Sequence, residues 1–173
     1  MNDKTEFLNE KAKELVDVCR EKGITLGFAE SLTGGMISAT VVNISGASAV
    51  FKGSVVSYTN EIKENVLGVP SEIIGMHTEV SEECAEAMAI GAAKVLGVRL
   101  AISVTGIAGP TGELPGKPVG TVYMGYSYEG PDFFGRITAA KRLNFTGDRD
   151  TIRTDTVIAA LEQAIKLVRE GKA

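Results

Sequence analysis

Residues 100–104, Leu-Ala-Ile-Ser-Val, decide the fold class of this chain, because a nearly continuous apolar run predicts a central strand covered on both faces. Upstream of it, residues 24–29 and 49–58 have the composition of two further strands. Apolar residues at helical spacing and capping residues predict helices between the strands. These expected helices cover about residues 5–22, 33–43, 61–67, 82–96 and 149–169.

The segment downstream of the central strand predicts a β-hairpin. Residues 120–128 and 136–145 flank a turn at Gly130-Pro131. The complete order of elements predicts an α/β fold with a mixed, mostly parallel sheet of about five strands between layers of helices. The chain shows no repeat and no linker, so we expect a single domain over residues 1–173.

Composition excludes several classes of protein. With 44% hydrophobic and 23% charged residues in 173, the chain is not intrinsically disordered. A formal net charge of −4 argues against general nucleic-acid binding. Two cysteines within expected helices allow no disulfide framework, which favours a reducing compartment. No signal peptide is visible, and the uncharged run 31–51 is too polar to span a membrane, so we expect a cytoplasmic protein.

Three loops rich in hydroxyl groups and glycine follow the expected parallel strands, at residues 30–35, 57–63 and 105–112. Ligands of open α/β sheets bind at the carboxyl ends of the strands, where such loops meet. Together the loops indicate a site for a small polar or phosphorylated ligand. The alternative is that Gly, Ser and Thr are here ordinary loop residues.

Ser31 precedes Thr33, Gly34 and Gly35, which open an expected helix. Helix N-terminal amides there would face a phosphate or a developing oxyanion, although a serine at this place is also a common helix cap. A Ser-His-Asp triad is disfavoured because His77, the single histidine, falls in an expected loop away from the strand ends. Phosphate-loop and dinucleotide-binding patterns are absent, and no His/Cys cluster suggests a metal site.

Three basic residues are expected near the positive ends of helices: Lys63, Arg149 and Arg153. Such positions disfavour a cation unless an anion lies nearby. The alternative is simple neutralisation by acidic neighbours, such as Glu61 beside Lys63 and Asp150 beside the arginines. The sequence leaves both interpretations open.

Five motifs resemble the CinA C-terminal domain family, in the same order along the chain. They are AESLTGG (29–35), G-x4-Y-x-N-x2-K (53–63), VTGIAGP (104–110), KPVGTV (117–122) and GDR (147–149). The resemblance extends over about residues 7–168 and implies a three-layer α/β/α sandwich with a mixed five-stranded sheet. Residues 111–116 depart from the glycine-rich stretch usual in the family.

Enzymatically characterised members of this family are nicotinamide-nucleotide amidohydrolases, so the resemblance implies conversion of nicotinamide mononucleotide (NMN) to nicotinate mononucleotide and ammonia. It implies Ser31 as nucleophile, Lys63 as general base and Tyr58 as an assisting residue. It also implies no cofactor and, by analogy, a homo-oligomer. The residues expected to bind this pyridine nucleotide are Thr33, Gly34, Gly35, Thr105, Gly106, Gly109 and, for its phosphate, Arg149.

Ser-Lys chemistry is a physically reasonable solution for a chain without a usable histidine. A lysine serves as a base only when burial or nearby positive charge lowers its pKa toward neutrality. The alternative function is a non-catalytic nucleotide- or partner-binding module of the competence or damage-inducible type. The combination of Ser31, Tyr58 and Lys63 favours the enzyme, because a pure binding module does not need all three.

Overall fold

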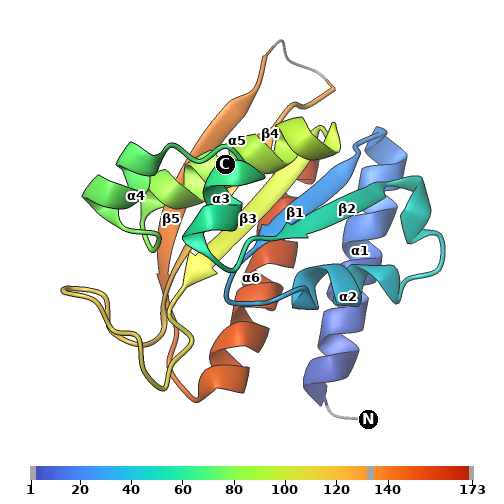
Figure 1. Ribbon diagram of the computed structural model, residues 1–173. Helices are drawn as coiled ribbons and strands as arrows, with labels where there is room; N and C mark the ends of the chain where they lie inside the picture. The colour runs from blue at the N-terminus through green and yellow to red at the C-terminus, as the bar shows by residue number, and fades with distance from the viewer. Residues whose placement is uncertain (1–2, 132–134, 172–173) are drawn as a thin grey trace.

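One five-stranded sheet organises the chain in a computed structural model that describes residues 3–131 and 135–171 (Figure 1). Its strands lie in the order β2-β1-β3-β4-β5. The strands are β1 (Leu26–Glu30), β2 (Phe51–Val56), β3 (Leu100–Gly106), β4 (Thr121–Tyr128) and β5 (Ile137–Asn144). The helices are α1 (Asp3–Lys22), α2 (Met36–Val42), α3 (Asn60–Asn65), α4 (Ser71–His77), α5 (Glu82–Leu96) and α6 (Arg149–Glu170), with a 3-10 turn η1 at Ala47–Ala49.

The sheet is mixed, as predicted, but parallel neighbours do not predominate. Strand β1 pairs in parallel with both β2 and β3, whereas β3 with β4 and β4 with β5 are antiparallel. The predicted hairpin explains why parallel and antiparallel pairs are equal in number. Its first strand, β4, pairs antiparallel with β3, and its second strand, β5, pairs antiparallel with β4. Its connecting segment falls partly on residues 132–134, outside the described residues.

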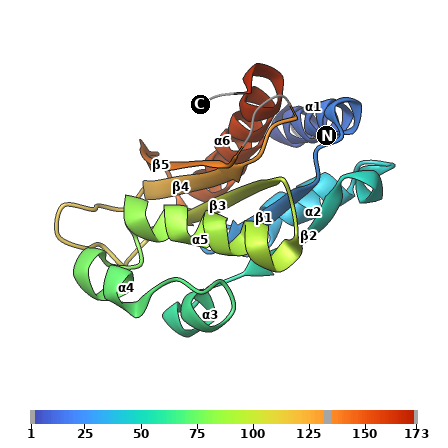
Figure 2. The same cartoon turned by 90° about the horizontal axis from the view of Figure 1, so that it is seen from above.

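Helices cover both faces of the sheet (Figure 2). Side chains alternate along the central strands, so that Phe28 and Ile102 belong to the core under α1, α2 and α6. Ala29 and Ala101 belong to a second core under α5. Small residues let α5 lie close to the sheet, since a Cβ on Gly125 of β4 would collide with the carbonyl oxygen of Ala85.

Capping residues explain most of the helix boundaries. The Ser81 side chain accepts a hydrogen bond from the amide of Cys84, and Gly97 ends α5, as predicted. Asp148 caps α6 by accepting from Thr151 N at 2.8 Å. The predicted cap Asn60 is wrong by one residue, because the side chain of Thr59 accepts the capping bond of α3.

Two further predictions about helices were wrong. Helix α2 begins at Met36 rather than near residue 33, because Gly35 has a left-handed φ of 100° and the preceding residues form turns. Helix α4 was not predicted at all, and His77 is its last residue rather than part of a loop. Within the described part of the chain, no helix has the length and apolar character needed to cross a membrane.

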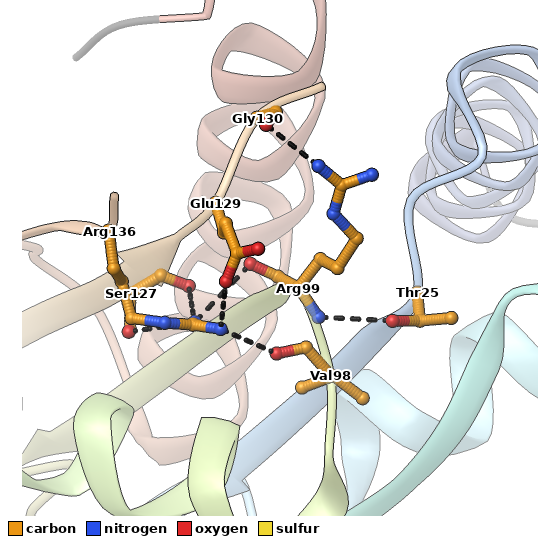
Figure 3. A network of polar contacts seen from close by, with 7 residues as sticks. All are labelled: Thr25, Val98, Arg99, Ser127, Glu129, Gly130 and Arg136. Atoms are coloured by element: carbon orange, nitrogen blue, oxygen red, sulfur yellow. Dashed lines mark hydrogen bonds and ion pairs between the residues drawn. The ribbon is translucent and has the colours of Figure 1, made fainter. Parts of the chain in front are cut away.

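A network of polar contacts lies at the end of the sheet where β3 begins (Figure 3). The Arg136 guanidinium donates to the carbonyl of Val98 at 3.1 Å, to the Ser127 hydroxyl at 3.1 Å and to Glu129 at 3.2 Å. Arg99 donates to the carbonyl of Gly130 at 2.7 Å. These bonds tie β3, β4 and the start of β5 together at the end of the sheet opposite the glycine-rich loops.

Candidate active site

Ser31 lies directly after β1, where the chain leaves the sheet between its two parallel neighbours. Its amide donates to the carbonyl of Val104 at 3.0 Å, and the amide of Ser57 donates to the carbonyl of Glu30 at 2.8 Å. These backbone bonds fix the start of the loop against both adjacent strands. The Ser31 residue is only 8% exposed.

Lys63 reaches Ser31 from α3 and is itself buried, with 1% of its surface exposed. Its Nζ lies 3.2 Å from Ser31 Oγ and donates to the carbonyl oxygen of Ser57 at 2.9 Å. The expected position in the first turn of the helix was wrong, since Lys63 lies in the last turn of a helix of six residues. The helix dipole therefore gives no reason for a lowered pKa at this lysine.

Burial lowers the pKa of Lys63 from its ordinary value of 10.5, while the nearby groups Cys84 and Glu79 act in the opposite direction. Burial also raises the pKa of the Cys84 thiol to about 11, so that thiol carries little charge near neutral pH. The free amine of Lys63 thus becomes accessible at a lower pH than for an exposed lysine. A neutral amine still has hydrogens for Ser57 and a lone pair for the Ser31 hydroxyl.

Arg149 and Tyr58 meet at the exposed side of the site. Arg149 Nη1 donates to the carbonyl of Gly109 at 2.8 Å, and Nη2 donates to the Tyr58 hydroxyl oxygen at 3.4 Å. Tyr58 is 62% exposed. Its hydroxyl is therefore placed beside Arg149 rather than between Ser31 and Lys63.

A cavity of about 260 Å³ brings together seven of the ten residues predicted for the site. These seven are Ser31, Tyr58, Lys63, Thr105, Gly106, Gly109 and Arg149. The lining also includes Leu32, Glu79, Val80, Ile107, Ala108, Thr111 and Gly112. The three polar loops thus converge at the carboxyl ends of β1, β2 and β3.

Thr33, Gly34 and Gly35 do not line the cavity. The Gly34 amide donates to the carbonyl of Ser31 at 3.1 Å, and the buried carboxylate of Glu30 takes the groups of Thr33 and Gly35 that were expected to face a ligand. It accepts hydrogen bonds from the Thr33 hydroxyl at 2.8 Å and from the Gly35 amide at 2.9 Å. The amides of Ile37 and Ser38 donate to the same carboxylate at 3.1 and 3.0 Å. An acidic residue just before a helix is the sequence signal for this internal cap.

Arg153 of α6 donates hydrogen bonds to the turn that follows Ser31. Its Nε donates to the carbonyl of Leu32 and its Nη2 to the carbonyl of Thr33, both at 3.0 Å. Arg153 is one helical turn from Arg149 on α6, so a single helix contacts both the Ser31 turn and the Gly109 loop. Neither an anion nor simple neutralisation is needed to explain Arg153, although its Nη1 also lies 3.8 Å from Asp150.

The sequence did not identify Glu79, which lies in the segment between α4 and α5. The Thr105 hydroxyl donates to its backbone carbonyl at 2.7 Å, which joins this segment to the end of β3. No spacing pattern signals that bond across 26 residues. His77 lies outside the cavity lining, with Nδ1 at 3.3 Å from Glu83. Over residues 3–131 and 135–171, no group of three His, Cys, Asp or Glu side chains is arranged to hold a metal ion.

Comparisons of sequence place the chain among known proteins. Residues 8–168 match the model of the CinA C-terminal domain. A CinA-like protein of Thermotoga maritima is 44% identical over 162 residues, which are 93% of this chain and 38% of that protein. A CinA-like protein of Dictyoglomus thermophilum is 47% identical over 148 residues, covering 86% of this chain and 34% of that protein. The chain therefore spans little more than a third of the length of these relatives.

Solved structures show the same fold. The competence damage-inducible protein A of Klebsiella pneumoniae superposes with a TM-score of 0.87 at 33% identity, covering 94% of this chain and 97% of that one. The competence/damage inducible protein CihA of Agrobacterium tumefaciens superposes with a TM-score of 0.84 at 34% identity, covering 92% and 94% of the two chains.

Proposed function

The chain belongs to the CinA C-terminal domain family, and from that premise we propose that it hydrolyses the carboxamide of NMN to nicotinate mononucleotide and ammonia. The observation that carries the proposal is the 3.2 Å approach of Lys63 Nζ to Ser31 Oγ in a nearly buried position. A nucleophile and a base within hydrogen-bond distance are the pair that acyl transfer requires.

In the proposed first half-reaction, the lone pair of neutral Lys63 takes the proton of the Ser31 hydroxyl while Oγ attacks the carboxamide carbon. The tetrahedral intermediate then collapses, its C–N bond breaks, and the Lys63 ammonium returns the proton to the leaving nitrogen as ammonia forms. The amide of Leu32 is the candidate donor to the oxyanion, because this residue follows the nucleophile and lines the cavity.

In the second half-reaction, Lys63 takes a proton from a water molecule that attacks the ester carbon of the acylated Ser31. The C–O bond to Ser31 breaks, the hydroxyl is restored with the proton held by Lys63, and the new carboxylic acid loses its remaining proton to solvent as nicotinate mononucleotide is released. The nucleophile, the base and the acid in this scheme are all side chains of the chain itself.

Arg149 is the proposed partner of the substrate phosphate. It opens α6 at the exposed side of the cavity, and Tyr58 and the loop 105–109 lie next to it. A guanidinium forms paired hydrogen bonds to a phosphate, and helix amides favour the same anion. We place Tyr58 in substrate binding on the strength of its contact with Arg149.

The test is release of ammonia from NMN by the purified protein and by Ser31→Ala, each with and without a chelator. We expect turnover in the wild type and a fall in kcat of about 10³-fold or more in the variant, because the nucleophile is lost. The variant should lose no more than about 1 kcal/mol of stability, since Gly35 and not Ser31 is the N-cap residue of α2.

NMN binding without turnover in the wild type would contradict the enzyme and favour a non-catalytic nucleotide-binding module. Normal hydrolysis by Ser31→Ala would contradict the nucleophile. Far-ultraviolet circular dichroism of both proteins separates loss of chemistry from loss of fold.

A further inference from the structure

Glu79 is the one carboxylate among the described residues that line the cavity. Its backbone is fixed on the side that leads into α5: its carbonyl accepts from the Thr105 hydroxyl at 2.7 Å, and the next two residues, Val80 and Ser81, are buried. An acidic side chain is thus carried to the edge of the Ser31–Lys63 site by a well-anchored segment.

The charge of Glu79 is not neutralised by an ion pair within the described part of the chain. Of the two cations that line the cavity, Arg149 lies at the exposed side, where it donates to the carbonyl of Gly109 and the hydroxyl of Tyr58. The other, Lys63, is driven toward its neutral form by burial, against the influence of Glu79. With Lys63 as the free base, the charges of the lining are the Glu79 carboxylate and the Arg149 guanidinium, and the Arg149 charge lies beside Tyr58.

We propose that Glu79 recognises the positive charge of the substrate's pyridinium ring and makes this cavity selective for a cationic heteroaromatic amide over a neutral one. This inference rests on the proposed function. The ring nitrogen of NMN is positively charged because it is bonded to the ribose, and the ring must enter the inner cavity for its carboxamide to reach Ser31. A carboxylate in that partly desolvated space attracts the ring more strongly than it would in water.

The same charge favours release of the product. Hydrolysis replaces the neutral carboxamide with a carboxylate on the same ring, and that carboxylate lies in the cavity that Glu79 also lines. Like charges at short range repel, so the product is bound less tightly than the substrate although the two differ in one small group.

The experiment compares NMN with its reduced 1,4-dihydro form, which has the same ribose, phosphate and carboxamide but a neutral ring. The kcat/KM ratio of the two is measured for the wild type, for Glu79→Gln and for the control Glu82→Gln. Glu82 is an exposed first-turn residue of α5 outside the cavity lining, so its variant loses the same charge close by. Intrinsic reactivity of the two amides cancels when the ratios are compared between variants.

We expect Glu79→Gln to lower the preference for NMN about tenfold, mainly through the KM for NMN, and Glu82→Gln to leave it within twofold. Product inhibition by nicotinate mononucleotide should become stronger in Glu79→Gln. Dissociation constants in a Ser31→Ala background report the same preference without turnover. Rates are taken on the pH plateau of each protein, because removing Glu79 also lowers the pKa of Lys63.

Turnover of NMN with the same preference in wild type and Glu79→Gln would overturn the inference and leave the proposed function intact. A wild type that releases no ammonia from NMN would contradict the proposed function itself. An equal loss of preference in Glu82→Gln would show a general field effect and would also overturn the role of Glu79.

Discussion

Arg136 and Arg149 lie at opposite ends of the same sheet and are bonded very differently. Arg136 is surrounded by protein acceptors, including the carbonyl of Val98, the hydroxyl of Ser127 and the carboxylate of Glu129. The bonds of Arg149 within the described chain go to one carbonyl at 2.8 Å and to the exposed Tyr58 hydroxyl at 3.4 Å. A guanidinium has five donors, so Arg149 retains capacity for a ligand, whereas both terminal nitrogens of Arg136 are occupied by protein acceptors.

Two glutamates repeat the same contrast within the site. Glu30 is completely buried and satisfied by four amide and hydroxyl donors of the following turn and helix, among others. Glu79 lines the cavity, and no such set of donors reaches its carboxylate from the described residues. Structural and functional polar residues in this chain are therefore of the same types. They differ in how many of their donors or acceptors are already bonded within the protein.

The largest effect in this comparison is expected for Arg149→Ala. The KM of this variant for NMN should rise about 10- to 100-fold, because the guanidinium that hydrogen-bonds to the phosphate is lost. The KM for nicotinamide riboside, which has no phosphate, should change little. Equal losses for the nucleotide and the riboside would show that Arg149 does not contact the phosphate.

A smaller effect is expected for Arg153→Met, because this arginine touches the site only through the turn after Ser31. Loss of its bonds to Leu32 and Thr33, both 3.0 Å long, should lower kcat about tenfold with little change in KM. Arg153→Lys should restore part of the rate, since an ammonium can donate to one of the carbonyls. A variant that binds weakly but turns over normally would assign Arg153 to the substrate instead.

The smallest effect on catalysis is expected for Arg136→Met at the far end of the sheet. Activity per folded molecule should stay within about twofold, while the free energy of unfolding falls by roughly 1–3 kcal/mol as buried acceptors lose their donor. Urea denaturation followed by circular dichroism measures the stability. A loss of kcat/KM comparable to that of Arg149→Ala would remove the distinction between the two ends.

The sequence predicts correctly those helices and strands whose signals lie within a few residues of one another. The central strand, the hairpin and α5 were predicted because apolar runs, capping serine and terminal glycine act within a few residues of the chain. Helix α4 was missed because its seven residues carry no capping side chain and Pro70 stands at its N-cap.

What the sequence did not show depends on the direction in which side chains turn and on contacts between distant segments. Glu30 lies only three and five residues before Thr33 and Gly35, and an acidic residue there is compatible with a cap. The sequence does not show that its carboxylate takes the Thr33 hydroxyl and the Gly35 amide, so these were assigned to a ligand. Glu79 becomes a cavity residue through a bond to Thr105, 26 residues away. The burial of Lys63 was expected only as a requirement of the chemistry, and the fold supplies it through the sheet loops and α5.

The pH dependence of NMN hydrolysis in wild type and Lys63→Arg tests the central claim most directly. Burial lowers the pKa of Lys63, so the free base is lost as pH falls, and kcat/KM should rise with pH along a limb whose midpoint lies below 10.5. Lys63→Arg should abolish turnover at every pH up to 10, because a guanidinium stays protonated there. Near-normal turnover in Lys63→Arg, with the same rising limb, would contradict Lys63 as the base.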